Sequence, residues 1–327
     1  YLVYRLTKGK VYATDYSNAS RTQLFNIFDL SWDREICAAF GIDVENLPEV
    51  KDSNACFGYT DCEGLFREPV PIHGVMGDSH AALFGQNCRS DGMTKVTYGT
   101  GSSIMMNIGY TPIISQNGLV TSLAWGLDGR PEYVLEGNLN YTGAVISWLK
   151  DDVKLIESAS ETEALANEAN KEDGLYLIPA FTGLGAPYWD SNARAAIVGM
   201  DRTTGKAELV RAGLESIAYQ ITDIVKAMER DSQKKIEVLR VDGGPTRNGY
   251  LMQFQSDIAG SDVAISRIEE LSGTGAAFMA GMALGLWGEE IFDTIKWDQV
   301  SPKMDEGVSA GKYEGYQNAV RLIRTGS

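Results

Sequence analysis

The sequence contains few of the residues that build disulfide frameworks or zinc sites. Among 327 residues there are only two histidines and four cysteines. No two cysteines have the CxxC spacing, so the usual zinc-ligand patterns are absent. A reducing cytoplasm is the simplest compartment for such a chain. The residues concerned are His73, His80, Cys37, Cys56, Cys62 and Cys88.

Positive charge and long apolar runs are also scarce. Lys and Arg total 29 against 44 Asp and Glu, the formal net charge is -15, and no dense Lys/Arg run occurs. Nucleic-acid-binding domains usually carry a basic patch, so this balance argues against such a partner, whereas a small anionic ligand held by backbone amides is compatible. The longest apolar run, residues 273–288, is short and glycine-broken for a membrane span, and we expect no signal peptide. We expect a protein that binds neither nucleic acid nor membranes.

Several nucleotide-binding signatures are missing. Neither a Walker A motif nor the HRD and DFG motifs occur, which excludes P-loop enzymes and protein kinases. The GxGxxG fingerprint of dinucleotide-binding proteins fails at Ile104, Tyr188 and Phe278, where its last glycine should stand. A dinucleotide-dependent oxidoreductase therefore does not fit.

One carboxylate, Asp78, lies where a strand is expected to meet a helix. Apolar residues predict a buried strand over residues 70–76, and residues 79–86 predict the start of a helix. At a strand's carboxyl end, where α/β folds place their chemistry, Asp78 could accept the proton of a hydroxyl that attacks a phosphoryl group. The alternative is that Asp78 only caps the helix.

Two glycine-rich turns follow Asp78 along the chain. At the tip of a predicted hairpin, Gly99 and Gly101 expose backbone amides beside the hydroxyl of Thr100, an arrangement that suits phosphate oxygens. Residues 242–248, DGGPTRN, follow a strand and open a helix, so a nucleotide could approach bare backbone there. Each turn taken alone could equally be a plain structural loop. Combined with Asp78, the turns indicate phosphoryl transfer.

The pattern along the chain predicts a mixed α/β sheet. Residues 94–137 indicate two β-hairpins, the second turning near Asp128-Gly129. Helices are expected over residues 138–151, 158–171 and 206–230, and then a strand, a helix, a strand and a helix follow between residues 235 and 287. In that last helix a row of small residues recurs every four positions, which would let another backbone approach closely. The row is Gly273, Ala277, Gly281 and Gly285.

Long strings spread over the chain resemble the FGGY carbohydrate kinases, and within that family the glycerol kinases. They are GDSHAALFGQ, MTKVTYGTG, LIPAFTGLGAPYWDSNAR, LESIAYQ and VDGGPTRNGYLMQFQSDIAG. The resemblance implies an actin-like ATPase (ribonuclease H-like) fold with two domains. Residues 1–87 would be the remainder of the first, substrate-side domain, and residues 88–327 the second, nucleotide-side domain.

The family's Asp-x-Gly-Thr phosphate loop and Arg-Glu substrate pair are absent from the chain. We therefore expect the first domain to be incomplete and residues 1–327 alone to be inactive. Self-association into a homo-oligomer would follow from exposing the surface on which the missing part packs.

The same resemblance implies ATP and Mg²⁺ as cofactors in the cytoplasm and assigns roles to individual residues. Asp78 matches the catalytic base and, indirectly, the metal site. Thr100 and Gly101 match phosphate contacts, Gly143 lies in the matching helix, and Gly244 with Asn248 matches the adenosine pocket. A terminal hydroxyl of a polyol or sugar would accept the phosphoryl group.

Two departures from the glycerol kinases concern the substrate, which Asp78, Ser79 and Ser103 would contact. Ser79 stands where those enzymes carry Gln, and Ser103 where they carry Phe. Both changes enlarge the cavity and add hydroxyls, which favours a longer polyol or a ketose over glycerol. A xylulokinase-like ketose kinase is thus an alternative to a glycerol kinase-like enzyme. A non-catalytic actin-like nucleotide-binding module is a further one.

Overall fold

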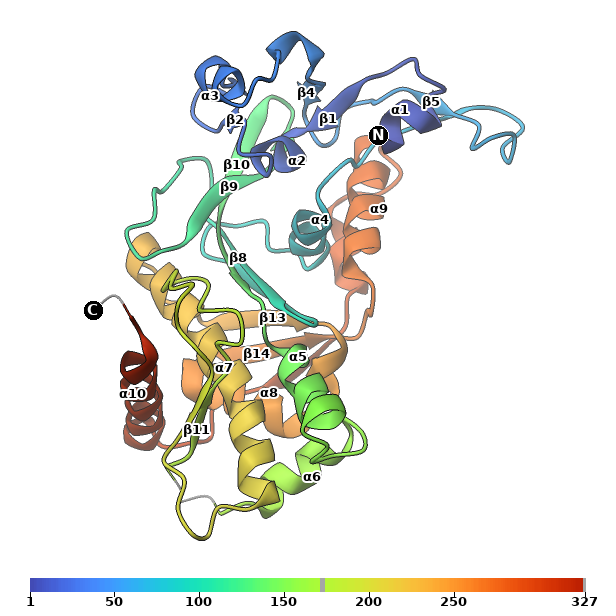
Figure 1. The fold of residues 1–327 in the computed structure, drawn as a ribbon. Helices are drawn as coiled ribbons and strands as arrows, with labels where there is room; N and C mark the ends of the chain where they lie inside the picture. The colour runs from blue at the N-terminus through green and yellow to red at the C-terminus, as the bar shows by residue number, and fades with distance from the viewer. Residues whose placement is uncertain (171–173, 326–327) are drawn as a thin grey trace.

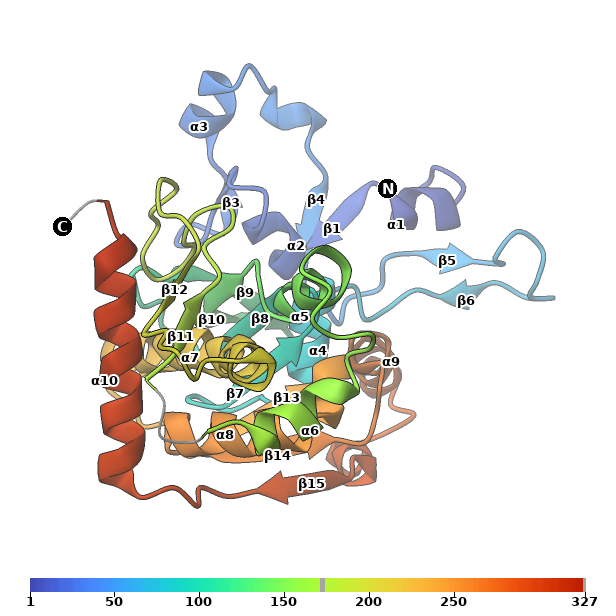
Figure 2. The ribbon, with the colours of Figure 1, turned by 60° about the horizontal axis from the view of Figure 1, so that its bottom comes forward.

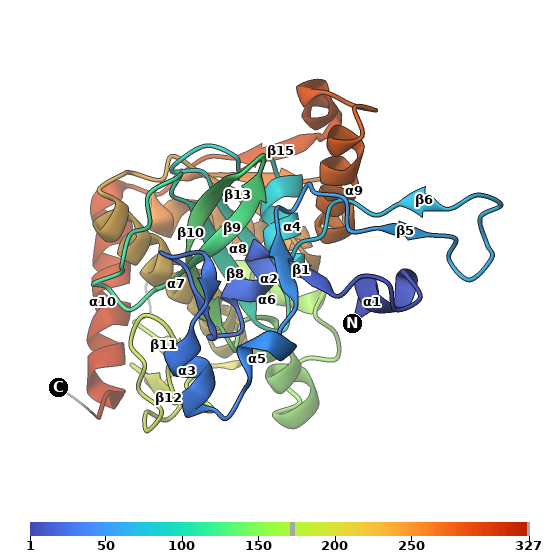
Figure 3. The ribbon, with the colours of Figure 1, turned by 90° about the horizontal axis from the view of Figure 1, so that it is seen from above.

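The computed structural model describes residues 1–170 and 174–325. The first part of the chain, at the top of Figure 1, consists of short elements. Its strands form two-stranded pairs only, β1 parallel to β4 and the β2–β3 and β5–β6 hairpins. The β5–β6 hairpin projects from the body beside α1 (Figure 3). The bounds are α1 Leu2–Leu6, β1 Ala13–Asp15, α2 Tyr16–Ser20, β2 Phe25–Asn26, β3 Ser31–Trp32, α3 Arg34–Ala39, β4 Glu49–Lys51, β5 Tyr59–Thr60, β6 Val70–Pro71 and α4 Asp78–Gly85.

A seven-stranded mixed sheet, counted over the described residues, organises the rest of the chain. Its order is β15-β14-β13-β7-β8-β10-β9, in which β13 runs parallel to β7 and β14 and the other pairs are antiparallel. Both predicted hairpins are present, β7–β8 and β9–β10. The bounds are β7 Thr94–Tyr98, β8 Ser102–Asn107, β9 Val120–Leu127, β10 Arg130–Leu139, β13 Val238–Asp242, β14 Asp262–Ser266 and β15 Trp297–Val300.

The two faces of this sheet are covered by different helices because apolar side chains alternate along the strands. On one face Val96, Ile104 and Leu135 pack against α7 and α8. On the other face Met105 and Val134 pack against α4 and α9. Figure 2 shows α10 along one edge of the body and α9 at the opposite side. The bounds are α7 Lys206–Ser232, α8 Gly249–Ala259, α9 Leu271–Ala283 and α10 Glu306–Ile323.

Shorter elements complete the body beside α7. β11 (Tyr176–Ile178) pairs with β12 (Ala196–Val198), and α6 (Glu161–Glu168) packs against α7. α5 (Gly143–Ser147) continues as a π-helical turn to Asp152. Among the described residues, no helix combines the length and apolar character needed to cross a membrane.

Helices α4 and α9 lie unusually close to each other because glycines face the contact. A Cβ atom at Gly275 would lie 1.8 Å from the carbonyl oxygen of Ala81, and one at Gly85 would lie 2.6 Å from that of Leu271. The close approach that we expected in α9 therefore exists, but it does not use the predicted row. A Cβ atom at Gly273 would make only ordinary contact, 3.6 Å from Glu270.

The two glycines of α9 allow a matched test of this contact. Gly275→Ala should lower the free energy of unfolding by about 1–3 kcal/mol, because the added methyl group must separate two packed helices. Gly273→Ala should leave it unchanged or raise it by up to about 1 kcal/mol, because alanine favours the helix without a clash. Urea denaturation of both variants checks this, and equal midpoints would contradict the packing.

The expected strand over residues 70–76 is wrong beyond its first two residues. β6 comprises only Val70 and Pro71, and Val70 is 39% exposed rather than buried. The chain leaves the hairpin because Gly74, at φ +70°, lies so close to α9 that a Cβ atom would be 2.3 Å from the Ala276 carbonyl oxygen. Asp78 therefore follows an irregular segment and not the end of a sheet strand.

Two expected helices are shorter than predicted. The helix over residues 138–151 begins only at Gly143, because Asn138 and Leu139 continue β10 in register with β8. The helix over residues 158–171 is α6, Glu161–Glu168, and residue 171 lies outside the described residues.

Candidate active site

Asp78 is the first residue of α4, and its side chain is exposed. Gly77 occupies the N-cap position, so the alternative that Asp78 is the helix cap does not hold. The carboxylate accepts a hydrogen bond from the Ser79 amide at 2.6 Å, and no other described residue donates to it. Residues near the start of the chain hold this turn in place. The Gly77 amide donates a hydrogen bond to Ser17 Oγ at 2.8 Å, and the Ser17 hydroxyl donates one to Asp15 at 2.7 Å.

The hairpin tip between β7 and β8 is fixed against the start of α5. The Gly143 amide donates to the Gly99 carbonyl at 3.0 Å, and the Ala144 amide donates to the Thr100 carbonyl at 3.0 Å. A Cβ atom at Gly143 would lie 2.5 Å from the Gly99 oxygen, so only glycine fits there. The amides of Thr100 and Gly101 donate to no described residue and are available to an anion.

The turn after β13 contains two glycines, one packed against the backbone of a neighbouring strand and one with free space above it. Gly243, at φ +99°, packs against the backbone of Tyr98, where a Cβ atom would lie 1.9 Å from the carbonyl oxygen. A Cβ atom at Gly244 would meet nothing within 4 Å. Asn248 ends the turn by accepting the Leu251 amide through Oδ1 at 2.9 Å and donating through Nδ2 to Thr162 Oγ1 at 3.0 Å.

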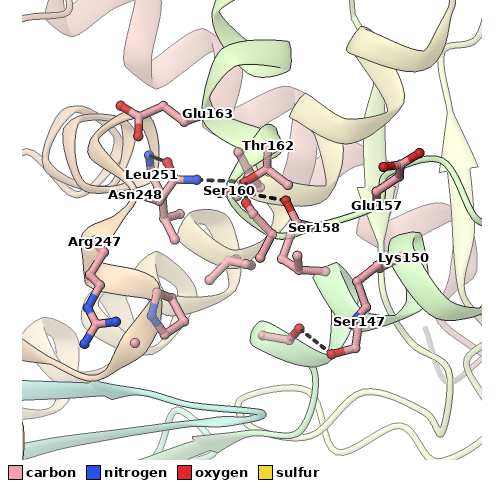
Figure 4. A pocket seen from close by; sticks show the side chains of 17 residues that line it. Ser147, Lys150, Glu157, Ser158, Ser160, Thr162, Glu163, Arg247, Asn248 and Leu251 are labelled. Atoms are coloured by element: carbon pink, nitrogen blue, oxygen red, sulfur yellow. Dashed lines mark hydrogen bonds between the residues drawn. The ribbon is translucent and has the colours of Figure 1, made fainter.

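A cavity of about 650 Å³ opens between α5, the segment that leads into α6, and the turn after β13 (Figure 4). Its size suits a small-molecule or cofactor site. In Figure 4, Arg247 and Asn248 line one side of the cavity, and Ser147 and Lys150 line the other. Of the residues predicted from the sequence, the cavity brings together Gly143, Gly244 and Asn248, whereas Gly99, Thr100 and Gly101 do not line it and join it only through their contacts with α5.

Sequence reasoning missed most of the polar lining. The segment before and within α6 contributes hydroxyls and carboxylates, which the prediction of a helix over residues 158–171 did not include. The available signal was two serines, Ser158 and Ser160, just before the helix and a threonine, Thr162, in its first turn. The missed residues are Lys150, Glu157, Ser158, Ser160, Thr162, Glu163 and Arg247.

A row of polar side chains crosses the α4 face of the sheet near its edge. The register pairs Asp242 with Thr97, Thr97 with Ser103, and Ser103 with Asn138, so these four residues share one face. We call these four residues the polar row. It connects the turn at Gly243 to the predicted substrate residue Ser103.

Beneath the polar row lies Lys95, a fully buried lysine that sequence reasoning also missed. Its Nζ atom donates to Thr97 Oγ1 at 3.0 Å and to Ser103 Oγ at 3.3 Å. Burial lowers the pKa of Lys95, and the negative charges of Asp242, Glu136 and Asp78 oppose that shift. Lys95 therefore interacts with both predicted substrate residues, with Ser103 on β8 through a hydrogen bond and with Asp78 on α4 through its charge.

The two histidines have different surroundings. Burial lowers the pKa of His80 to about 3, and its Nε2 atom is directed to Ser122 Oγ at 3.4 Å. His73 Nδ1 lies 2.8 Å from the backbone oxygen of Asn54. The carboxylate of Asp78, in contrast to the buried His80, is exposed at the start of α4.

Comparison with known proteins identifies the class. Residues 1–85 match the N-terminal domain and residues 94–284 the C-terminal domain of the FGGY family of carbohydrate kinases. The chain therefore belongs to this family, and the expected α/β actin-like ATPase fold with a mixed sheet is confirmed.

Similar proteins within the family include glycerol kinases, which confirms the predicted resemblance. The chain is 49% identical to those of Natranaerobius thermophilus, over 324 residues, and Carboxydothermus hydrogenoformans, over 327 residues. These alignments cover 98% and 99% of the chain but 65% of each relative, so the chain spans about two thirds of the relatives' length.

Solved structures give the same result. Glycerol kinase from Plasmodium falciparum, crystallised with ADP, matches with a TM-score of 0.91 and 35% identity over 98% of the chain and 65% of that protein. Ligand-bound xylulose kinase from Lactobacillus acidophilus matches with a TM-score of 0.88 and 23% identity over 99% of the chain and 66% of that protein. The second likeness concerns the fold alone.

Proposed function

We propose that the full-length protein transfers the γ-phosphoryl group of ATP to a terminal hydroxyl of a polyol or sugar. The observation that carries the proposal is the exposed carboxylate of Asp78, at the start of α4 and on the sheet face that bears Ser103, in a chain that also has a cavity lined by Gly143 and Gly244. Asp78 would accept the proton of the attacking hydroxyl as the general base. We place the domain boundary between residues 87 and 88.

The nucleotide is proposed to lie in the cavity with its phosphates toward the β7–β8 hairpin. Adenosine would rest between Gly244, Asn248 and α5, where no side chain fills the space above Gly244. The free amides of Thr100 and Gly101 would hold phosphate oxygens. This orientation directs the transferred group to the side of the sheet on which Asp78 lies.

The acidic groups fit a magnesium ion carried by the nucleotide. Among residues 1–170 and 174–325 there is no cluster of three or more His, Cys, Asp or Glu side chains that could hold a metal alone. Mg²⁺ is commonly bound by one or two carboxylates together with substrate phosphates. Asp78 and Asp242, whose buried Oδ1 atom has no hydrogen-bond partner, are the carboxylates suited to this role, in which the ion would neutralise phosphate charge.

A cytoplasmic location agrees with the chemistry of the chain. All four cysteines are free thiols, and Cys37 and Cys88 are buried. Free thiols together with ATP as a substrate are typical of a reducing compartment.

The acceptor is proposed to be larger than glycerol. Ser79 is only partly buried, and Ser103 presents a hydroxyl where the resemblance places an aromatic ring in glycerol kinases. We expect a four- or five-carbon polyol or a ketose such as xylulose to have a higher kcat/KM than glycerol, because glycerol would leave space and hydroxyls unfilled.

A coupled assay of ADP release by the full-length protein over glycerol, erythritol, xylitol and xylulose measures this preference. Ser103→Phe should shift it toward glycerol. If glycerol gives the highest kcat/KM for the unmodified protein, the proposed acceptor is wrong and glycerol is the substrate.

A non-catalytic nucleotide-binding module is the second candidate function. The glycine-lined cavity would serve it equally well, but such a module has no need of an exposed carboxylate at Asp78. ATP binding without acceptor-dependent ADP release would favour this candidate.

A further inference from the structure

Asn138 is a polar residue near the end of β10, and the proposed reaction does not use it. It stands directly opposite Ser103 in the β8–β10 pairing. Its neighbour Gly137 faces α7, where a Cβ atom would lie 2.5 Å from Ile224 Cγ2, so Asn138 faces the opposite side, toward α4. The side chain is exposed, and no described residue forms a hydrogen bond with it.

Lys95 determines whether the Ser103 hydroxyl can donate or accept a hydrogen bond with a substrate. An ammonium group only donates hydrogen bonds, so the Ser103 oxygen accepts from Lys95 and the hydroxyl proton points elsewhere. No described residue accepts that proton. Ser103 therefore offers a donor next to the Asn138 amide, which offers both donors and an acceptor.

Both groups lie on the side of the sheet that carries Asp78. Leu83 and Phe84 of α4 pack against Met105 and Val134, the residues two and four positions along the strands from Ser103 and Asn138. The charge of Asp78 acts on the Lys95 ammonium that holds Ser103. A substrate hydroxyl at Asp78 would thus have its remaining carbon chain close to the Ser103–Asn138 pair.

We infer that Ser103 and Asn138 form a specificity site for an oxygen atom that glycerol lacks, with Lys95 as a positioning residue that orients Ser103. This inference rests on the proposed function and names its acceptor class, a linear polyol or ketose of four or more carbons. The additional oxygen accepts a hydrogen bond from Ser103 and pairs with the Asn138 amide.

The test compares kcat/KM for xylulose or xylitol with kcat/KM for glycerol in the full-length protein. Asn138→Ala should lower this ratio about 3- to 30-fold, because one substrate hydrogen bond is lost. Using a ratio removes differences in the active fraction of each preparation. Asn318→Ala, an exposed asparagine on α10 without a side-chain hydrogen bond to a described residue, is the matched control and should leave the ratio unchanged.

The role of Lys95 is tested by a double-mutant cycle. Lys95→Met should lower the same ratio, whereas in a Ser103→Ala background it should change the ratio no further, because Lys95 acts through Ser103. A purely structural role of Lys95 would reduce turnover of all substrates together and leave the ratio constant in both backgrounds. That result would overturn the positioning role.

The outcomes separate this inference from the proposed function. If the unmodified protein phosphorylates no member of the panel, both are overturned. If it phosphorylates the panel but Asn138→Ala and Ser103→Ala leave the ratio unchanged, only the specificity site is overturned.

Discussion

Asp78→Asn is expected to lower kcat of the full-length protein about 100- to 10,000-fold, the usual loss when a general base is removed. The carboxamide keeps the size of the side chain but cannot take the proton of the attacking hydroxyl. ATP affinity measured without Mg²⁺ should not change, because the cavity beside Gly244 is lined by other residues. Steady-state kinetics and calorimetric ATP titration measure the two quantities.

The control for this variant is Asp293→Asn. Asp293 is exposed, and no described residue forms a hydrogen bond with its side chain. It should retain normal turnover. Turnover of Asp78→Asn close to that of the unmodified protein would remove Asp78 from the mechanism.

Gly244→Val is expected to weaken ATP binding at least about tenfold, equivalent to about 1.4 kcal/mol. The valine side chain would enter the cavity that Gly244 lines, and its Cβ atom would meet no protein atom within 4 Å. The free energy of unfolding should therefore change little while the nucleotide loses its space. Calorimetric Kd values and urea denaturation test the two parts separately.

Gly311→Val on α10 is the matched control. This glycine also has no atom within 4 Å of an added Cβ, but it does not line the cavity. It should bind ATP normally. If folded Gly244→Val binds ATP as tightly as Gly311→Val does, the nucleotide lies elsewhere.

The sequence predicted those turns and helices that are determined by residues close together in the chain. The β9–β10 hairpin turns at Asp128 and Gly129, which have φ values of +51° and +78°, as the Asp-Gly pair indicates. The helix expected over residues 206–230 is α7, Lys206–Ser232, because apolar residues recur at helical spacing over its whole length.

The errors arose where distant segments decide the structure. Gly74 bends the chain away from a strand because it packs on α9, about two hundred residues later in the sequence. The tight α4–α9 contact uses Gly275 because Ala81 lies opposite it, which spacing within α9 alone does not reveal.

The residues of the candidate site that the sequence predicted are mainly glycines and an aspartate in turns. The buried Lys95 was not predicted. Lys95 in the string KVTY resembles a solvent-facing strand residue. The negative charges of Asp242 and Glu136, which oppose the effect of burial on its pKa, come from strands distant in the sequence. The resemblance to a family supplied Gly143, which no local pattern singles out.

The most direct test of the account is product formation from ATP by the full-length protein with Mg²⁺ and the polyol and ketose panel, followed by phosphorus NMR. We predict a phosphomonoester signal that grows in step with ADP, requires the acceptor and is nearly lost in Asp78→Asn. ATP binding without any phosphomonoester, or equal product from Asp78→Asn and the unmodified protein, would contradict the account.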